Sequence, residues 1–210
     1  MKRARPYDRE AALDAALNLF WTKGYHATSL KDLEAALNMK PGSIYAAFSS
    51  KEALYLAALE RYSHLHRDRL RKLGEEAGSP LKALADLMRN VAQCSSDDPD
   101  CRPCMLIKTL VDVTTDDDQI ARQSRQYLDE VRNEVAALFA LAKSKGELPP
   151  DADPLRLAQR YQSELSALKI EAHCATDREG LLALAEDMAQ QFEQLRVPPS
   201  NSTKRSKGRS

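Results

Sequence analysis

The chain has 210 residues and a formal net charge of zero; 43% of its residues are hydrophobic and only 6% are aromatic. This length fits one or two domains, and the small numbers of aromatic residues and glycines argue against a β-sandwich or barrel and favour helices. No apolar run approaches the roughly 18 residues that a membrane span needs, so we expect no membrane partner. The basic first residues are not followed by an apolar segment, which predicts a cytoplasmic protein. Taken alone, a net charge of zero would argue against a nucleic-acid partner.

The zero is the sum of three segments with different charge. Residues 1–51 contain eight Lys or Arg and five Asp or Glu, a net charge of +3. Residues 52–196 contain nineteen against twenty-six, a net charge of −7, and residues 197–210 contain four against none, a net charge of +4. Such asymmetry along a chain indicates partners that the whole-chain sum conceals.

The first fifty residues predict three helices. Asp8 is a suitable N-cap for the first helix, which runs to about Lys23 and ends at Gly24. A short second helix follows Ser29, where Asp32 completes a capping box, and Asn38 suits the left-handed residue that ends a helix. The apolar positions of these three helices recur with helical spacing and are assigned to the core: Leu13, Ala16, Leu17, Phe20, Leu30, Leu33, Leu37, Ile44 and Phe48.

The third predicted helix starts at Pro41, a residue that the first helical turn tolerates, and ends at Ser49 and Ser50. A long fourth helix runs from near Lys51 to about Leu73, and the segment from Gly74 to Pro80 predicts a break. Five more helices are predicted at about 80–94, 104–114, 118–145, 153–175 and 178–196.

We therefore expect an all-α chain of about nine helices. Residues 1–51 are predicted to form a helix-turn-helix DNA-binding domain, the helix over 51–73 connects it to the body, and residues 52–197 form a larger helical domain. The polar segment 198–210 is predicted to be a disordered basic tail.

A recognition helix must pack on one face and carry small side chains on the other, so that its axis can approach the floor of the major groove. The first turn of the third helix meets this requirement. Tyr45 offers a hydroxyl to a phosphate, and Lys51 opens the next helix close to the expected DNA backbone. An arm of Lys2, Arg3 and Arg5 could add a phosphate tether or enter a minor groove. The candidate DNA contacts are Thr28, Ser29, Lys40, Pro41, Gly42, Ser43, Tyr45, Ala46 and Lys51.

The stretch from Thr28 to Leu54, with its lead-in from Ala16 to Thr28, resembles the DNA-binding domain of TetR-family transcriptional regulators. Two positions differ from the family pattern: Asn38 replaces a common glycine, and Lys40 replaces a common small hydroxyl residue. The resemblance implies a three-helix head on a larger helical body, and it assigns residues 52–197 as an effector-binding and dimerisation domain. Most such proteins repress transcription and release DNA when they bind their ligand.

The resemblance also implies partners: a pseudo-palindromic double-stranded operator, a second copy of the chain and a small-molecule effector of unknown identity. The two C-terminal helices would form the homodimer interface, and two heads about 34–36 Å apart would read successive major-groove faces. An effector cavity would lie among the middle helices, although most of these residues are expected to be ordinary core: Met88, Val91, Ala92, Met105, Tyr127, Phe139 and Tyr161.

Cys94, Cys101 and Cys104 form a C-x6-C-x2-C cluster, and Cys174 lies far downstream. Three interpretations stay open: small buried or incidental loop residues, a site that senses oxidants or electrophiles, and a metal site. Cys104 starts a predicted helix, and a helix N-terminus stabilises a thiolate. Some TetR-like regulators carry a cysteine in a similar place and sense such compounds, which favours thiol chemistry over metal.

An alternative of another class is a small thiol- or metal-dependent enzyme that uses Cys94, Cys101, Cys104 and His173. Such an enzyme needs a nucleophile, a base and a group that stabilises the transition state. The sequence contains no phosphate loop and no His-Glu-x-x-His motif. We therefore expect a DNA-binding regulator rather than an enzyme, with no cofactor and no metal site.

Overall fold

The computed structural model describes residues 8–94 and 102–198, and these residues form nine helices and no strand. The all-α prediction with about nine helices is thereby confirmed. None of the described helices has both the length and the apolar character that crossing a bilayer requires. The predicted arm of Lys2, Arg3 and Arg5, the residue Cys101 and the tail beyond 198 lie outside the described residues. The helices are α1 (Arg9–Lys23), α2 (Leu30–Leu37), α3 (Pro41–Phe48), α4 (Lys51–Glu76), α5 (Pro80–Gln93), α6 (Met105–Asp112), α7 (Asp118–Ser144), α8 (Pro154–Cys174) and α9 (Arg178–Glu193).

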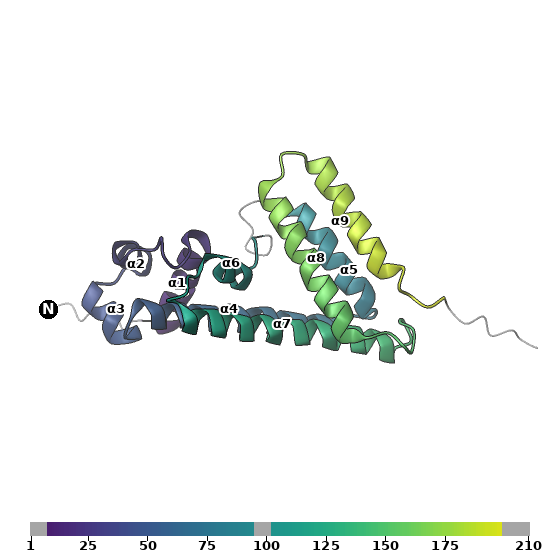
Figure 1. Ribbon diagram of the computed structural model, residues 1–210, viewed down its shortest axis with the longest axis horizontal. Helices are drawn as coiled ribbons and strands as arrows, with labels where there is room; N and C mark the ends of the chain where they lie inside the picture. The colour runs from purple at the N-terminus through teal and green to yellow at the C-terminus, as the bar shows by residue number, and fades with distance from the viewer. Residues whose placement is uncertain (1–7, 95–101, 199–210) are drawn as a thin grey trace, which may run out of the picture.

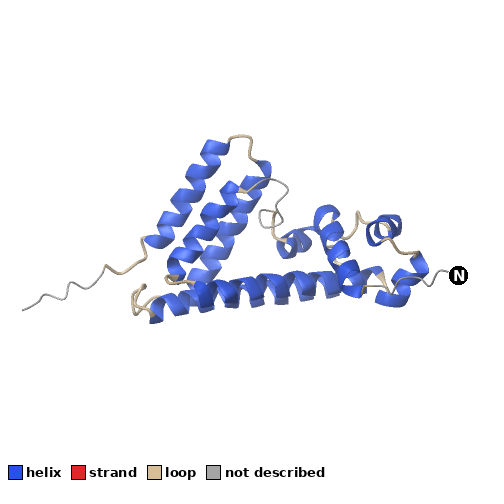
Figure 2. Cartoon of the chain, turned by 180° about the vertical axis from the view of Figure 1, so that it is seen from behind, coloured by secondary structure: helices blue, strands red, loops and turns tan. Residues whose placement is uncertain are grey.

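The two longest helices, α4 and α7, lie side by side and form the base of the molecule (Figure 1). Helices α1, α2 and α3 gather at one end of this base, and α5, α8 and α9 rise together from the other end (Figures 1 and 2). The short helix α6 lies between the two groups, against α7. The arrangement separates a small head from a larger body.

The predicted local signals of the head are present. The Asp8 carboxylate accepts hydrogen bonds from the backbone N–H groups of Glu10 and Ala11 and so caps α1. Ser29 and Asp32 form a reciprocal capping box at the start of α2, and Asn38 adopts φ 51° and ψ 43° at its end. Gly24 ends α1 at φ 84°, a conformation that L side chains rarely adopt.

The break predicted from Gly74 to Pro80 starts too early. Helix α4 continues through Gly74 to Glu76, and the chain leaves helical geometry only at Ala77. A Cβ atom on Gly74 would lie 2.9 Å from a methyl group of Leu138 on α7. This glycine therefore allows α4 and α7 to approach each other closely, and it does not end a helix.

Buried side chains form two hydrophobic clusters. The first contains α1, α2, α3 and the first half of α4, and it also takes in Met105 and Leu106 of α6 and Ile120 of α7. The second joins the end of α4 with α5, α7, α8 and α9. Helices α4 and α7 thus contribute to both clusters, and α6 packs with the head although it follows the body helix α5 in the chain.

Candidate nucleic-acid interface

Helix α3 has one buried face and one exposed face. Ile44 and Phe48 are 1% and 5% exposed and pack into the first hydrophobic cluster. The turn from Asn38 to Lys40 sets the angle between α2 and α3, with the Met39 N–H donating to the Glu34 carbonyl at 3.2 Å. The opposite face of α3 is exposed and carries small or polar residues together with one tyrosine: Gly42, Ser43, Tyr45 and Ala46.

The N-terminus of α3 is open to solvent. Its N-cap, Lys40, is exposed and makes no side-chain capping hydrogen bond. Pro41 has no N–H, and the Gly42 N–H is one of the first-turn donors that have no partner within a helix. This end combines a positive helix dipole with a lysine and is suited to bind an anion.

Neither the backbone conformation nor the packing at position 42 requires a glycine. Its φ is not positive, in contrast to Gly24 and Gly146. A Cβ atom added at Gly42 would have no neighbour within 4 Å. An alanine would fit there in the free protein and would favour the helix.

Thr28 and Ser29 shape the turn before α2. Thr28 is 1% exposed, and its hydroxyl donates to the Gly24 carbonyl at 2.6 Å. Ser29 is exposed, but its N–H and hydroxyl both donate to Asp32, at 2.8 and 2.7 Å. The ion pair of Asp32 with Lys23 and these bonds from Ser29 hold the pKa of the Asp32 carboxyl well below its usual range. An acidic group therefore already occupies the N-terminus of α2.

The two side chains predicted to contact phosphates differ in their surroundings. Tyr45 is 43% exposed on the outer face of α3. Lys51 is half-buried, with its ammonium 4.6 Å from the ring centroid of Tyr25, and this burial lowers the pKa of the ammonium. The cation–π contact holds Lys51 at the first position of α4, beside the end of α3.

Arg9 is a candidate contact that the sequence reasoning missed. The guanidinium carbon of this exposed residue lies 5.4 Å from the ring centroid of Phe48, the last residue of α3. The first turn of α1 thus adds a cation close to the exposed end of α3. The sequence shows a basic residue directly after the N-cap Asp8, but only the three-dimensional packing shows that its side chain reaches α3.

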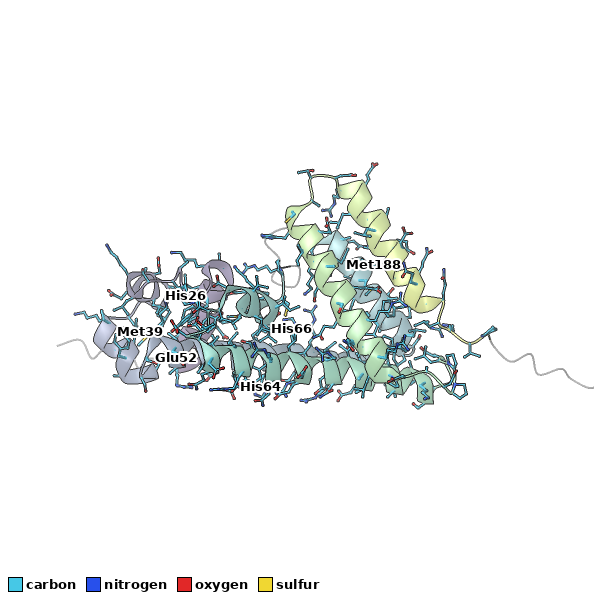
Figure 3. All side chains as sticks on the ribbon, viewed as in Figure 1. His26, Met39, Glu52, His64, His66 and Met188 are labelled. Atoms are coloured by element: carbon cyan, nitrogen blue, oxygen red, sulfur yellow. The ribbon has the colours of Figure 1, made fainter. Side chains whose placement is uncertain are left out.

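Hydrogen bonds connect the end of α1 and the turn that follows it to α6 and to the turn before α7. The Trp21 indole N–H donates to the Pro103 carbonyl at 2.8 Å. The Lys108 ammonium donates to the carbonyls of Trp21 and Thr22, both at 2.9 Å. His26, labelled in Figure 3, lies with its Nε2 2.8 Å from an Asp117 carboxylate oxygen. These contacts connect the head to elements that follow the body helix α5.

A cavity of about 620 Å³ lies among α4, α5, α7 and α8. Two residues predicted to line an effector cavity, Val91 and Tyr161, do line it. The others belong to the packed interior, as expected for most of them: Met88, Ala92 and Phe139 lie in the second cluster, whereas Met105 lies in the first and Tyr127 packs against the first. The volume falls in the range of sites for small organic molecules, about 300–1,000 Å³.

The described cysteines occupy three different places. Cys94 follows α5, lines the cavity and is engaged in a disulfide. Cys104 is the N-cap of α6 and is a free, half-buried thiol that packs against the first cluster. Cys174 is a free, exposed thiol at the end of α8. Within 8–94 and 102–198, no group of three or more His, Cys, Asp or Glu residues is arranged to hold a metal ion.

Comparison with known proteins identifies the class. Residues 12–58 match the family described as "Bacterial regulatory proteins, tetR family". The HTH-type transcriptional repressor ComR of Escherichia coli is 33% identical over 188 residues, covering 87% of this chain and 89% of ComR. A variant of the TetR family regulator CifR with three cysteine substitutions, solved with a 26-base-pair operator duplex, is 30% identical with a TM-score of 0.73, covering 93% of this chain and all of that chain.

A helix-turn-helix head on an all-helical body is the architecture of a bacterial DNA-binding regulator. The chain belongs to the TetR family, and it is a DNA-binding transcriptional regulator. Regulators of this family act on double-stranded DNA as dimers and respond to effector ligands.

Proposed function

We propose that this chain is a cytoplasmic repressor, and not an enzyme, that binds a pseudo-palindromic operator as a homodimer. It releases the operator when a small molecule occupies the cavity among α4, α5, α7 and α8. The observation that carries the proposal is the outer face of α3, where glycine, serine, tyrosine and alanine are exposed next to the open N-terminus of the helix. ComR is named a repressor, and CifR was solved on operator DNA, which supports the same action here.

The proposed contacts divide into two kinds. Gly42, Ser43 and Ala46 let α3 approach the base edges, whereas Lys40, Tyr45 and Lys51 contact phosphates. Pro41 pre-orders the first turn of the helix. We assign Thr28 and Ser29 to positioning, because the Thr28 side chain is buried and Ser29 is bonded to Asp32. Arg9 joins the phosphate contacts.

The outer faces of α8 and α9 support the proposed dimer. Ile170 and Leu182 are 49% and 39% exposed, and they flank the turn between the two helices. Ala167 on α8 and Ala183 on α9 are also exposed, so both helices present apolar side chains to solvent. We expect Leu182→Glu to shift the chain from dimer to monomer in sedimentation velocity, whereas Val111→Glu, an equally polar change at an exposed residue of α6, leaves the dimer intact. A dimeric Leu182→Glu variant would place the interface elsewhere.

Release by thiol chemistry is the second candidate for the signal. It is favoured by the disulfide at Cys94 on the cavity wall and by the free thiol of Cys104, one residue after the carbonyl that holds Trp21. We expect a mild oxidant to weaken operator binding reversibly if this route operates. A Cys94/Cys101/Cys104→Ser triple variant that responds as the wild type does would rule it out.

The experiment that tests the main proposal is fluorescence anisotropy with the DNA upstream of the chain's own gene, titrated at several salt concentrations. Wild-type protein should bind tightly, with an affinity that falls steeply as salt rises. A Tyr45→Ala/Lys51→Ala variant should lose most of this binding, whereas Lys82→Ala, which changes an exposed body lysine, should not. Unchanged binding by the double variant would contradict the assigned contacts.

A further inference from the structure

The ammonium of Lys51, at the start of α4, is held by an aromatic ring and not by a carboxylate. It lies 4.6 Å from the ring centroid of Tyr25, in the turn after α1. No ion pair to Lys51 occurs within residues 8–94 and 102–198, and Asp32, the acidic residue whose charge reaches it, is already paired with Lys23 at 2.7 Å. An aromatic ring attracts a cation without neutralising its charge. The charge of Lys51 therefore stays available to a phosphate.

The ring of Tyr25 is itself held by aromatic neighbours. Its centroid lies 4.9 Å from that of Tyr55 on α4 and 5.1 Å from that of His26. His26, labelled in the head in Figure 3, has its Nε2 2.8 Å from a carboxylate oxygen of Asp117, the N-cap of α7. Contacts from α4 and from the start of α7 thus fix the ring that faces Lys51.

Tyr55 connects these rings to α6. Its hydroxyl oxygen lies 2.7 Å from the hydroxyl oxygen of Thr109. The Thr109 hydroxyl donates its own hydrogen to the Met105 carbonyl at 2.7 Å, so Tyr55 is the donor in the bond between the two hydroxyls. Both side chains are buried, and a buried hydroxyl that loses its partner is costly. The position of the Tyr55 ring therefore depends on where α6 lies.

We propose that Tyr25 is a positioning residue for DNA binding: its ring holds the Lys51 ammonium where a phosphate meets it, and Tyr55 makes this placement depend on α6. A lysine side chain that is held before the DNA arrives loses less conformational freedom on binding. A displacement of α6 that breaks the hydrogen bond of Tyr55 would loosen the rings and weaken the phosphate contact. The inference rests on the proposed function only in taking Lys51 as a phosphate contact.

The first measurement is a double-mutant cycle of operator affinity in the full-length protein, with Tyr25→Leu and Lys51→Gln made singly and together. We expect Tyr25→Leu to weaken binding about threefold to tenfold when Lys51 is present, the range for one cation–π contact. In the Lys51→Gln background it should have no further effect, because no ammonium remains to be positioned. Tyr25→Phe keeps the ring and should bind as the wild type does.

The cycle also tests a purely structural role. If Tyr25→Leu weakens binding equally in both backgrounds, Tyr25 only supports the fold and the proposal is wrong. Tyr25→Met, which also lacks a ring but is unbranched and more adaptable, repeats the cycle in case the leucine variant does not fold. Far-ultraviolet circular dichroism of each variant shows whether the helices are retained.

Nuclear magnetic resonance of protein with ¹³C-labelled lysine tests the contact in the absence of DNA. An aromatic ring shifts the resonances of a methylene group held over its face upfield. The ε-methylene signal of Lys51, identified by its absence in Lys51→Gln, should be shifted upfield in the wild type and in Tyr25→Phe. In Tyr25→Leu it should move to the position of exposed lysines. A Lys51 signal already at that position in the wild type would overturn the proposal.

Tyr55→Phe tests the dependence on α6, because it removes the hydroxyl and keeps the ring. We expect this change to move the Lys51 signal towards that of an exposed lysine and to weaken operator binding only while Lys51 is present. Tyr127→Phe is the matched control, since Tyr127 also packs against the first cluster, but from α7. An unchanged Lys51 signal in Tyr55→Phe would overturn the dependence on α6.

The single variant Lys51→Gln separates this inference from the proposed function. If it binds the operator as tightly as the wild type does, the phosphate contact assigned in the proposed function is wrong. If it weakens binding and the effect of Tyr25→Leu simply adds to it, the phosphate contact stands and only the positioning role of Tyr25 is overturned. Weakened binding together with a non-additive cycle supports both.

Discussion

The indole N–H of Trp21, at the end of α1, donates a 2.8 Å hydrogen bond to the carbonyl of Pro103, two residues before α6 begins. Trp21 is 7% exposed, and the guanidinium of Arg102 lies 5.4 Å from its ring centroid. Helix α1 packs against α2 and α4, and α6 packs against α7. A displacement of α6 would therefore be transmitted through this bond to α1, the helix that packs against α2 of the helix-turn-helix.

The first prediction concerns this bond. Trp21→Phe keeps an aromatic ring and removes the donor, which leaves the half-buried Pro103 carbonyl without this partner. We expect the free energy of unfolding to fall by about 1–3 kcal/mol, measured by urea denaturation with far-ultraviolet circular dichroism. Thr22→Val is the matched control, because it removes only an exposed bond to the Asn18 carbonyl, and it should change stability by less than about 0.5 kcal/mol.

Trp21 is also the one tryptophan of the chain, so the tryptophan fluorescence of the wild type reports only on the surroundings of Trp21. A ligand that releases the operator through α6 should shift the emission. Release of the operator without any change in emission would show that the signal bypasses the contact between Trp21 and Pro103.

The second prediction concerns Lys108, whose ammonium donates to the carbonyls of Trp21 and Thr22 in the last turn of α1. A cation at a helix C-terminus both satisfies free carbonyls and interacts favourably with the helix dipole. Lys108→Met should lower the free energy of unfolding by about 0.5–2 kcal/mol. Lys108→Arg should retain part of the stability. Equal stability of Lys108→Met and wild type would mean that water replaces the ammonium at no cost.

The third prediction concerns pH. Arg89 on α5 bonds both carboxylate oxygens of Glu186 on α9, at 2.7 and 3.1 Å, and it also bonds Glu193. The bonds from Arg89, and then that from Gln190, lower the pKa of Glu186 to about 2. In the unfolded chain this pKa is about 4.3. Between these values the unfolded state binds more protons, so the stability that Glu186 contributes above pH 4.3 is lost as the pH falls towards 2.

Arg89→Met should remove this pH dependence together with the ion pairs. The free energy of unfolding of the variant, measured in urea at pH 7, 5, 4 and 3, should start lower than that of the wild type and decline less steeply below pH 5. Parallel declines for the two proteins would show that other carboxylates dominate the acid range.

Most of the fold was predictable because its signals are local. Asp8, the pair of Ser29 and Asp32, and Asn38 act on backbone groups within four residues, so the sequence around them is sufficient. Gly74 was misread because its reason lies on another helix, where Leu138 occupies the space that a Cβ atom would need. A sequence shows a glycine but not the neighbour that requires it.

The same distinction applies to the candidate interface. The helical spacing predicts that Ile44 and Phe48 are buried, and that assigns Tyr45 and Ser43 to the outer face. The contact of Lys51 with Tyr25 and the approach of Arg9 to Phe48 depend on how α1, α3 and α4 meet, which no local pattern encodes. Thr28 matches the family motif, but burial assigns its hydroxyl to the Gly24 carbonyl.

The fourth prediction tests Arg9. If it neutralises a phosphate, Arg9→Gln should weaken binding to all DNA sequences by a similar factor and reduce the slope of log affinity against log salt by about 1 per protomer. Arg122→Gln is the control, since Arg122 is an exposed α7 cation paired with Asp118. An unchanged slope for Arg9→Gln would restrict Arg9 to its contact with Phe48.

The fifth prediction separates stability from DNA binding at Gly42. Because its φ is not positive and a Cβ atom would meet nothing within 4 Å, Gly42→Ala should leave the protein as stable as the wild type or stabilise it by up to about 1 kcal/mol. The added methyl group lies on the face of α3 that must approach the groove. Operator affinity should therefore fall by about tenfold or more, equivalent to at least about 1.4 kcal/mol.

Gly78→Ala is the matched control, because Gly78 also has open space around it but lies between α4 and α5, away from the proposed interface. It should leave operator affinity unchanged. A Gly42→Ala protein that binds the operator as tightly as the wild type does would mean that α3 does not enter the groove as closely as proposed. Weakened binding together with unchanged stability shows instead that glycine at position 42 is needed for binding DNA and not for folding.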